Sequence, residues 1–366
     1  MQPYNIEIFD RNFDIKQHYN TENVSYTFDY LDIVENTTLV PYSKEVERGQ
    51  YIRLTNGENT YFGVISGIDV GSEVEGFSEI RYKPFMSIFD TDVLFDTNWQ
   101  PQAGAGSTLT MEEVIVKLIT DYWIANTDDD ANIPGLEAEE ISATPDWGLH
   151  LTSDVKDLHK TIVNFNTSII SRALTKYQIG VYVEPDMNSK AIRIQVGRKE
   201  TAVFKIEADL QSVLDRKIVL NSTTTDTNKL VIYDSADLET RVIYYKHTDG
   251  THDMTDEDRI IPVIQSIQSV NTSQDTTFAQ AAQEAADKAF DTDTYNNLIE
   301  IEVKSDDQNI TPGEMGIGRL VEVITQGAIY PSIMTGYVKG NTTRLIFGTI
   351  RVEASKKLKR LLKNGG

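Results

Sequence analysis

The sequence predicts an α+β fold that is mainly β and multidomain, with two similar small β-barrel-like domains and an intervening α+β domain. Three observations support this. The chain has 366 residues, which is more than one hydrophobic core usually serves. Short runs of alternating apolar and polar residues, closed by Gly, Pro and Asn turns, fill both ends of the chain, and this pattern is typical of β-strands. Long helical periodicity is confined to a few stretches between them.

Residues 1–95 are expected to form the first β-barrel-like domain. Strands are expected at 4–9, 25–34, 51–54, 61–68 and 79–82. Asn56-Gly57 separates two of these runs and is a strong hairpin signal, because Asn and Gly tolerate the positive φ angles of a type I′ turn. Many short strands closed by turns indicate a small barrel or sandwich.

Residues 96–108 contain Pro101, Gly104 and Gly106 and are expected to be a loop between domains. The α+β domain then spans 109–205. Thr110 and Glu113 have the spacing of a capping box, which predicts that a helix begins there.

A second helix is expected at 154–174, followed by a hairpin that pairs 178–184 with 191–196. The apolar residues of this helix repeat at helical spacing. They are Val155, Leu158, Ile162, Phe165, Ile169 and Ile170.

The second β-barrel-like domain is expected at 206–350, with a helical insertion at 277–290 that is rich in Ala. Residues 351–366 are expected to form a basic C-terminal helix. Its cations either favour a helix C-terminus and a solvated face, or dock against an acidic partner surface.

The two β regions share an order of features. In each, a strand led by a glycine (47–54; 315–324) turns into a strand that starts with an aromatic residue and reaches Gly67 or Gly336. Either the chain contains an internal duplication, or two β-meanders resemble each other by chance. A duplication would let three subunits in a ring imitate six-fold symmetry.

The net charge of −22 argues against gripping nucleic acid or an anionic membrane, because both are negatively charged. The acidity can also serve solubility alone. There is no cysteine, which excludes disulfides and thiolate metal sites. No signal peptide and no membrane-spanning segment are recognisable, so synthesis and initial folding in the cytoplasm are expected.

Three parts of the chain carry a resemblance to a known family. They are the hairpin Gly49–Gly67, the helix–hairpin region 109–205, and the ending that runs from Pro312-Gly313 to Phe347-Gly348. In this order they resemble the tail hub, or tail-associated (Tal), proteins of bacteriophages, which are related to the baseplate hub of contractile tails. The ending at Gly365-Gly366 resembles the short form of this family, without a fibre or peptidoglycan-degrading extension.

The resemblance implies a homotrimer at the tip of a phage tail, forming a ring that continues or closes the tail tube. The ring would open at infection, and DNA would pass through without specific binding. The expected partners are adjoining tail proteins such as the distal tail protein, the tape-measure protein and receptor-binding proteins. The expected location is the virion.

The sequence predicts no catalytic, cofactor-binding or metal-binding residues. Asp128, Asp130, Asn132 and Glu139 have the spacing of a calcium loop, but Ile133 stands where the loop needs glycine. A solvated acidic loop is therefore the favoured interpretation.

The five histidines offer no clear zinc set. His247 and His252 lie near Asp249 and Asp253, but a zinc site needs three or four convergent ligands. His150 and His159 are interpreted as surface or capping residues. Motifs of serine hydrolases, P-loops and dinucleotide-binding folds are also missing.

The sequence therefore predicts a non-enzymatic structural hub. The first alternative is a carbohydrate-binding or adhesin-type module, because aromatic rings on β folds can stack on sugars. Trp99, Trp123 and Trp147 fall near the helical region instead of on one strand face, which weakens this alternative. The second alternative is a hydrolase whose site carries no recognisable motif.

Overall fold

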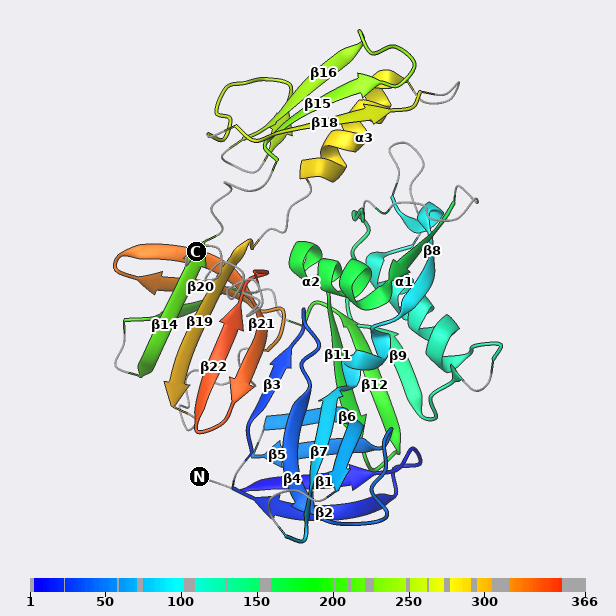
Figure 1. Cartoon of the computed structure of the whole chain (residues 1–366), viewed down its shortest axis with the longest axis vertical. Helices are drawn as coiled ribbons and strands as arrows, with labels where there is room; N and C mark the ends of the chain where they lie inside the picture. Colours follow the sequence, from blue (N-terminus) through cyan, green and yellow to red (C-terminus); the bar gives the residue numbers. More distant parts are fainter. Residues whose placement is uncertain are drawn as a thin grey trace, which may run out of the picture. The chain divides into compact units, whose positions relative to one another are not determined.

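The computed structural model divides the chain into two compact units. Unit 1 comprises residues 1–219 and 294–366, and unit 2 comprises residues 220–293. Strands dominate, so the predicted α+β, mainly β class is confirmed (Figure 1). The residues that the structure describes are 3–22, 24–57, 59–70, 75–101, 109–128, 131–149, 151, 159–199, 202–209, 212–220, 227–247, 251–261, 263–272, 277–290, 295–304 and 316–350.

The first sheet of unit 1 has six strands, all paired antiparallel. The strands are β1 (Tyr4–Phe9), β2 (Ile15–Thr21), β4 (Asn36–Pro41), β5 (Tyr51–Asn56), β6 (Asn59–Val70) and β7 (Phe77–Pro84). Their order is β2-β1-β5-β6-β7-β4. The predicted hairpin is confirmed, because Asn56 pairs with Asn59 and Gly57 has a φ of 60°.

The second sheet of unit 1 has the order β13-β20-β21-β22-β19-β14. The strands are β13 (Phe204–Glu207), β14 (Val213–Leu220), β19 (Asn297–Lys304), β20 (Leu320–Thr325), β21 (Ala328–Lys339) and β22 (Thr342–Phe347). A seventh strand comes from the other end of the chain. This strand, β3 (Tyr26–Asp29), pairs antiparallel with β21, from Gly336 opposite Asp29 to Lys339 opposite Tyr26.

The meander β5-β6-β7 and the meander β20-β21-β22 have the same construction. In each, a long middle strand pairs with the preceding strand along its first half and with the following strand along its second half. The register shifts at Gly67 in β6 and at Gly336 in β21. Such β-bulges bend the strand and increase its twist.

The equivalence extends to the residues that lead into each meander. Gly49 donates its N–H to the Ile65 carbonyl, and Gly318 donates to the Met334 carbonyl, both at positive φ (85° and 84°). The same spacing of 269 residues separates the equivalent positions: Gly49 from Gly318, Ile65 from Met334, and Gly67 from Gly336. The shared φ angles explain why glycine begins both meanders.

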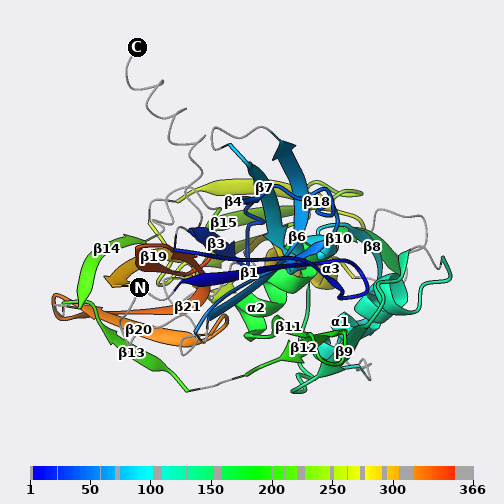
Figure 2. The same ribbon diagram turned by 90° about the horizontal axis from the view of Figure 1, so that it is seen from below.

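Between the two sheets in sequence lies an α+β part. It contains the helices α1 (Met111–Ile119) and α2 (Ser171–Tyr177) and the strands β8 (Asp92–Asp96), β9 (Leu136–Glu140), β10 (Lys160–Asn164), β11 (Gly180–Asp186) and β12 (Ala191–Gly197). β11, β12 and β9 form a sheet that lies beside α1 in both views (Figures 1 and 2). β8 pairs with β10 as a separate ribbon.

The predicted start of the first helix is confirmed. Thr110 Oγ1 accepts from Glu113 N at 3.2 Å, and Glu113 Oε2 accepts from Thr110 N at 2.6 Å. This reciprocal pair satisfies two backbone donors that a helix start leaves free. After Ile119 the helix widens into a π-helical turn, Thr120–Ile124.

The predicted helix at 154–174 is wrong over residues 160–164, and its first residues, 154–158, lie outside the described part of the chain. Lys160–Asn164 is the strand β10, and Ile162 is 45% exposed instead of lying on a buried helix stripe. After β10, a π-helical turn at Phe165–Ile170 leads into α2. The reason is long-range pairing, since Ile162 lies opposite Leu94 of β8.

Unit 2 is an inserted sheet-and-helix unit, whereas we expected only its helix to be an insertion into the second β domain. It contains β15 (Lys229–Asp234), β16 (Arg241–Lys246), β17 (His252–Asp253) and β18 (Gln265–Val270), in the order β17-β16-β15-β18. Its helix α3 (Phe278–Phe290) has almost the predicted bounds. Ala282, Ala286 and Phe290 are buried against the sheet at a spacing of four residues.

Several sequence predictions fall outside the described residues. They include the basic helix at 351–366, most of the loop at 96–108, and the Pro312-Gly313 turn. No described helix is both long enough and apolar enough to cross a membrane.

Candidate functional site

Two of the four candidate calcium ligands, Asn132 and Glu139, make hydrogen bonds within the protein. Asn132 Oδ1 accepts from Asn126 N at 2.8 Å, and its amide donates to the Asn126 carbonyl at 3.2 Å. Glu139, on β9, accepts from Gln195 on β12 at 3.1 Å. Asp130 lies outside the described residues. These contacts close the loop on itself and fix a strand pair.

The two loop histidines each pair with a separate carboxylate. His247 Nε2 lies 3.0 Å from Asp253 Oδ1, and His252 Nε2 lies 2.8 Å from Asp287 Oδ1 on α3. The pKa of Asp253 is lowered to about 2, first by hydrogen bonds from Thr255 and then by His247. Among the described residues no group of three or more His, Asp or Glu could hold a metal ion.

Of the two histidines interpreted as surface or capping residues, the structure describes one. His159 is exposed and leads into β10, where its carbonyl accepts from Thr97 N at 2.7 Å. His150 lies outside the described residues.

The tryptophans belong to the core of the α+β part. Trp123 and Trp147 are buried, and Trp123 stacks on Phe165 with ring centroids 5.4 Å apart. Trp99 packs edge-on against Phe95. None of the three is arranged as an open aromatic platform, which counts against the carbohydrate-binding alternative.

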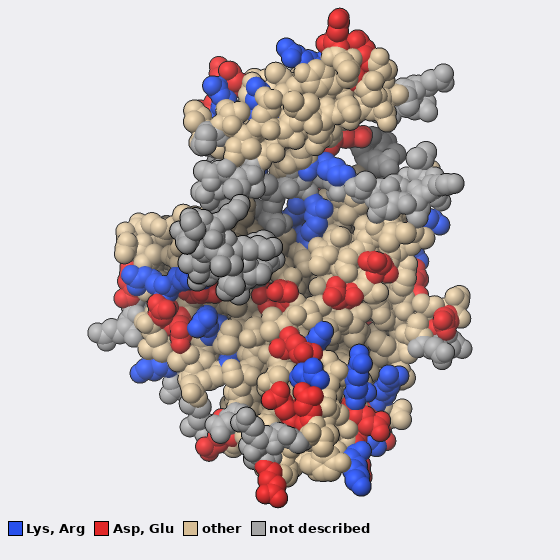
Figure 3. Space-filling view, viewed as in Figure 1, with Lys and Arg blue, Asp and Glu red and all other residues tan. Residues whose placement is uncertain are grey.

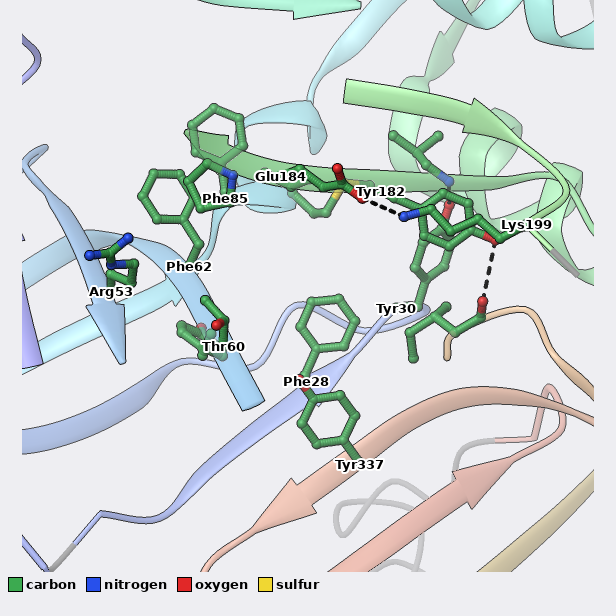
Figure 4. Close-up of a pocket in the computed structure, with 16 residues that line it drawn as sticks. Phe28, Tyr30, Arg53, Thr60, Phe62, Phe85, Tyr182, Glu184, Lys199 and Tyr337 are labelled. Atoms are coloured by element: carbon green, nitrogen blue, oxygen red, sulfur yellow. Dashed lines mark hydrogen bonds and ion pairs between the residues drawn. The ribbon is translucent and has the colours of Figure 1, made fainter. Parts of the chain in front are cut away.

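A pocket of about 410 Å³ opens in unit 1 beside β3, the strand that the N-terminal region lends to the second sheet (Figure 4). Four parts of the chain that are distant in sequence supply its walls. Its lining includes Phe28 from β3 and Tyr30 just after that strand, Arg53 from β5, Phe62 from β6 and Phe85 after β7. It also includes Tyr182 and Glu184 from β11, Lys199 after β12, and Tyr337 from β21.

The walls of this pocket are aromatic. Phe28 stacks on Tyr337 with ring centroids 5.6 Å apart, and Phe62 stacks on Phe85 at 5.5 Å. The two stacks lie on different sides of the hollow in Figure 4. Stacked rings of this kind contribute beyond the area they bury. The first stack therefore strengthens the pairing of β3 with β21, and the second holds β6 against the turn that follows β7.

Polar contacts fix β11 against its neighbours. Tyr30 Oη accepts from Val181 N at 2.8 Å, and Tyr182 Oη donates to the Ile317 carbonyl at 3.3 Å. Burial raises the pKa of Tyr182 to about 12 and raises that of Tyr30 as well. Both hydroxyls are therefore neutral hydrogen-bonding groups at ordinary pH.

One ion pair lies at the rim of the pocket. Lys199 Nζ is 2.6 Å from Glu184 Oε1 and 4.5 Å from the centroid of the Tyr182 ring. Glu184 is the single carboxylate among the described residues that line the pocket. Glycoside hydrolysis uses two facing carboxylates, so this geometry suits holding an apolar group and gives no support to the hydrolase alternative.

Sequence reasoning missed the pocket. The run Tyr26–Tyr30 is visibly aromatic, but nothing in it indicates that β3 leaves the first sheet. Lys199 and Glu184 come together only because β11 and the residues after β12 are neighbours in the fold.

No family model and no curated protein matches the sequence. The fold, however, is found among solved structures. A tail protein from Neisseria meningitidis MC58 superposes with a TM-score of 0.51 at 12% identity, covering 94% of this chain and 96% of that one. A 43 kDa tail protein of prophage MuSo2 from Shewanella oneidensis gives 0.52 at 12% identity, with 95% and 98% covered.

A chain of the p2 virion baseplate in its activated conformation gives a TM-score of 0.55 at 11% identity, with 94% of this chain and 98% of that chain covered. These matches span nearly the full length on both sides. The chain therefore has the fold of phage tail and baseplate proteins, and its resemblance to tail hub proteins is confirmed at the level of fold.

Proposed function

We propose that this chain is a non-enzymatic structural hub at the tip of a phage tail or of a prophage-derived injection device. Three copies would form a ring that continues or closes the tail tube and opens for DNA passage at infection. The full-length likeness in fold to tail and baseplate proteins supports this proposal.

The observation that carries the proposal is the repeated meander in unit 1. Gly49, Ile65 and Gly67 in the first sheet have counterparts in Gly318, Met334 and Gly336 in the second. Two similar β-barrel-like domains per subunit would let three subunits present six similar sheets around one axis. A six-fold tube could then join a three-fold tip without a mismatch in symmetry.

The surface charge supports a conduit that does not grip DNA. In Figure 3, Asp and Glu atoms are interspersed with Lys and Arg atoms over this face of unit 1, with no broad area of positive charge. The whole chain has a net charge of −22. Such a surface repels phosphate, so DNA would slide past without specific binding.

The partners in this proposal are further copies of the chain and adjoining tail proteins. These would include the distal tail protein, the tape-measure protein and receptor-binding proteins, with assembly in the host cytoplasm and residence in the virion. The aromatic pocket beside β3 is a place where one apolar side chain of such a partner would fit, because its walls are apolar and one ion pair lies at its rim.

Electron microscopy of the purified protein tests the proposal. We expect ring-shaped particles with three-fold symmetry, a central opening, and six similar densities around it that correspond to the two sheets of each copy. Compact particles without an opening, seen at every concentration that can be imaged, would overturn the ring.

A further inference from the structure

In the part of unit 2 that the structure describes, its one helix, α3, covers a single face of the sheet. α3 packs against the face that carries Leu230, Ile232 and Tyr244, which form a core with Ala282, Ala286 and Phe290. Side chains alternate between the two faces of a strand. Nine positions of three neighbouring strands therefore share the other face, which we call the open face. They are Lys229, Val231 and Tyr233 on β15, Arg241, Ile243 and Tyr245 on β16, and Gln265, Ile267 and Ser269 on β18.

The centre of the open face is an apolar row that runs across the strands. Val231 lies between Ile243 on one side and Ile267 on the other, in direct register. Ile267 is 62% exposed, which is unusual for a large apolar side chain in the middle of a strand. Ile261 and Val263, which precede β18, are exposed as well. Val231 itself is only 5% exposed, so Ile267 supplies most of the accessible apolar surface of the row. An exposed apolar group beside a packed apolar row indicates an interaction site.

Cations and aromatic rings border this row. Lys229 Nζ lies 5.9 Å from the centroid of the Tyr245 ring, and Arg241 Nη1 lies 3.5 Å from the Tyr233 hydroxyl oxygen. Tyrosine and arginine around an apolar centre are typical of protein–protein interfaces.

The charge of the open face is opposite to that of the rest of the unit. Residues 220–293 contain 14 Asp and Glu but only 5 Lys and Arg, a net charge of −9. Two of the five cations and none of the 14 carboxylates occupy the nine positions. Asp253, on β17, lies at the margin opposite Tyr245 and is bonded to His247. In Figure 3, the area over β15, β16 and β18 is mostly tan, with charged atoms toward its edges.

We propose that the open face docks against an acidic surface of a second copy of this chain. The complementary charge is present in the chain itself, because subtracting −9 from −22 leaves −13 on unit 1. A contact between two different surfaces of identical chains closes into a ring when the rotation allows it. The inference thus rests on the proposed function and names one contact of the ring.

A protein surface fits the open face better than a nucleic acid does. Single-stranded nucleic acids bind to aromatic rings within a positively charged groove, whereas the centre here is aliphatic and the unit is acidic overall. Nucleic acid binding is nevertheless a distinguishable outcome of the test below.

The test compares Ile267→Asp and the double variant Lys229→Glu/Arg241→Glu with the full-length wild-type chain. Leu238→Asp is the matched control, because Leu238 is also 67% exposed but lies in the turn between β15 and β16, off the open face. Each protein is followed by sedimentation velocity over a range of concentrations and salt, and its thermal unfolding confirms that unit 2 is folded.

We expect Ile267→Asp to weaken self-association about tenfold or more, because it places a carboxylate at the apolar centre of the contact, where charged residues are depleted in protein interfaces. The charge-reversal variant should also weaken it, most at low salt, and Leu238→Asp should associate like wild type. If wild type associates and all variants do so equally, the open face is not the contact, while the hub proposal stands.

Two other outcomes also overturn the inference. A wild-type chain that stays monomeric throughout removes both the docking contact and the self-assembly on which it rests. A separate measurement follows the fluorescence anisotropy of a labelled single-stranded oligonucleotide mixed with each protein. Binding by wild type that is lost in Lys229→Glu/Arg241→Glu, without an effect on self-association, would assign the face to nucleic acid instead.

Discussion

Gly336 lies at the residue where β21 carries β22 on one side and β3 on the other. A Cβ atom there would be 2.7 Å from the Phe28 carbonyl oxygen and 3.2 Å from Asp29 Cα, both parts of the β3 backbone. At the equivalent Gly67, the nearest atom would be Arg81 Nη2 at 2.7 Å, the end of a flexible side chain. The same bulge therefore tolerates a methyl group in one sheet but not in the other.

This difference gives a paired prediction. We expect Gly336→Ala to destabilise the fold by about 1–3 kcal/mol, because backbone must move to admit the methyl group. Gly67→Ala should cost clearly less. Chemical denaturation of both variants measures the difference, and equal losses would show that β3 is not held closely against β21.

The tyrosines of the first sheet and its junction with β21 form a second residue-scale feature. Tyr26, Tyr61 and Tyr82 are almost fully buried and in edge-on contact through Tyr61. Burial raises the pKa of Tyr4 to about 12, and it raises those of Tyr26, Tyr61, Tyr82 and Tyr337 as well. The native state therefore disfavours the ionised form of all five.

We expect stability to fall at alkaline pH for this reason. A group whose folded pKa is raised contributes its full stability below the unfolded pKa of 10.0, and loses it as the pH rises toward the folded value. The tyrosinate absorbance should therefore develop in two steps, exposed tyrosines first and the buried set together with unfolding. A single smooth titration near the unfolded pKa, with the fold intact, would contradict the burial of this cluster.

At the scale of elements, the sequence predicted correctly those turns and helices whose formation depends on residues close together in the chain. The Asn56-Gly57 hairpin, the capping box at Thr110 and the helix Phe278–Phe290 were predicted correctly, since turn chemistry, capping and helical spacing lie within a few neighbouring residues. The strand β10 was misread as helix, because its pairing partner β8 is more than 60 residues away. Pairing at that distance leaves no trace in a short window of sequence.

Helix α1 also contains a buried carboxylate whose hydrogen bonds could not be predicted from the sequence. Glu112 is fully buried in its first turn, and its carboxylate accepts from Ser142 Oγ at 2.6 Å, Thr144 N at 2.8 Å and Thr144 Oγ1 at 3.0 Å. These bonds fix the segment after β9 to the start of the helix. Buried polar groups that keep all their partners stabilise, and those that lose one are costly.

We predict that Glu112→Gln lowers the free energy of unfolding by about 1–3 kcal/mol, because an amide NH₂ would face hydroxyl and N–H donors. Glu113→Gln is the control, since Gln also completes a capping box. Thermal or denaturant unfolding compares the two. Similar losses for both variants would mean that the three contacts of Glu112 do not stabilise the helix start.

At the scale of the whole molecule, the multidomain and mainly β character could be predicted from chain length and residue pattern. Which strand belongs to which sheet could not. The repeated glycines hinted at two similar sheets, and the structure gives both meanders the same pairing and the same bulge. The exchange of β3 into the second sheet could not be predicted, because any edge strand of suitable pattern can pair with any open edge. The pocket beside β3 depends on that exchange, and so it was missed as well.

The central claim is that copies of this chain assemble into a closed ring of three. Native mass spectrometry of the purified full-length protein, over a range of concentrations, tests it most directly. The account predicts a dominant species with the mass of three 41.2 kDa chains, with no species beyond it at moderate concentration because a ring leaves no free contact. A dimer with isologous contacts, or an open series of increasing masses, would contradict the account.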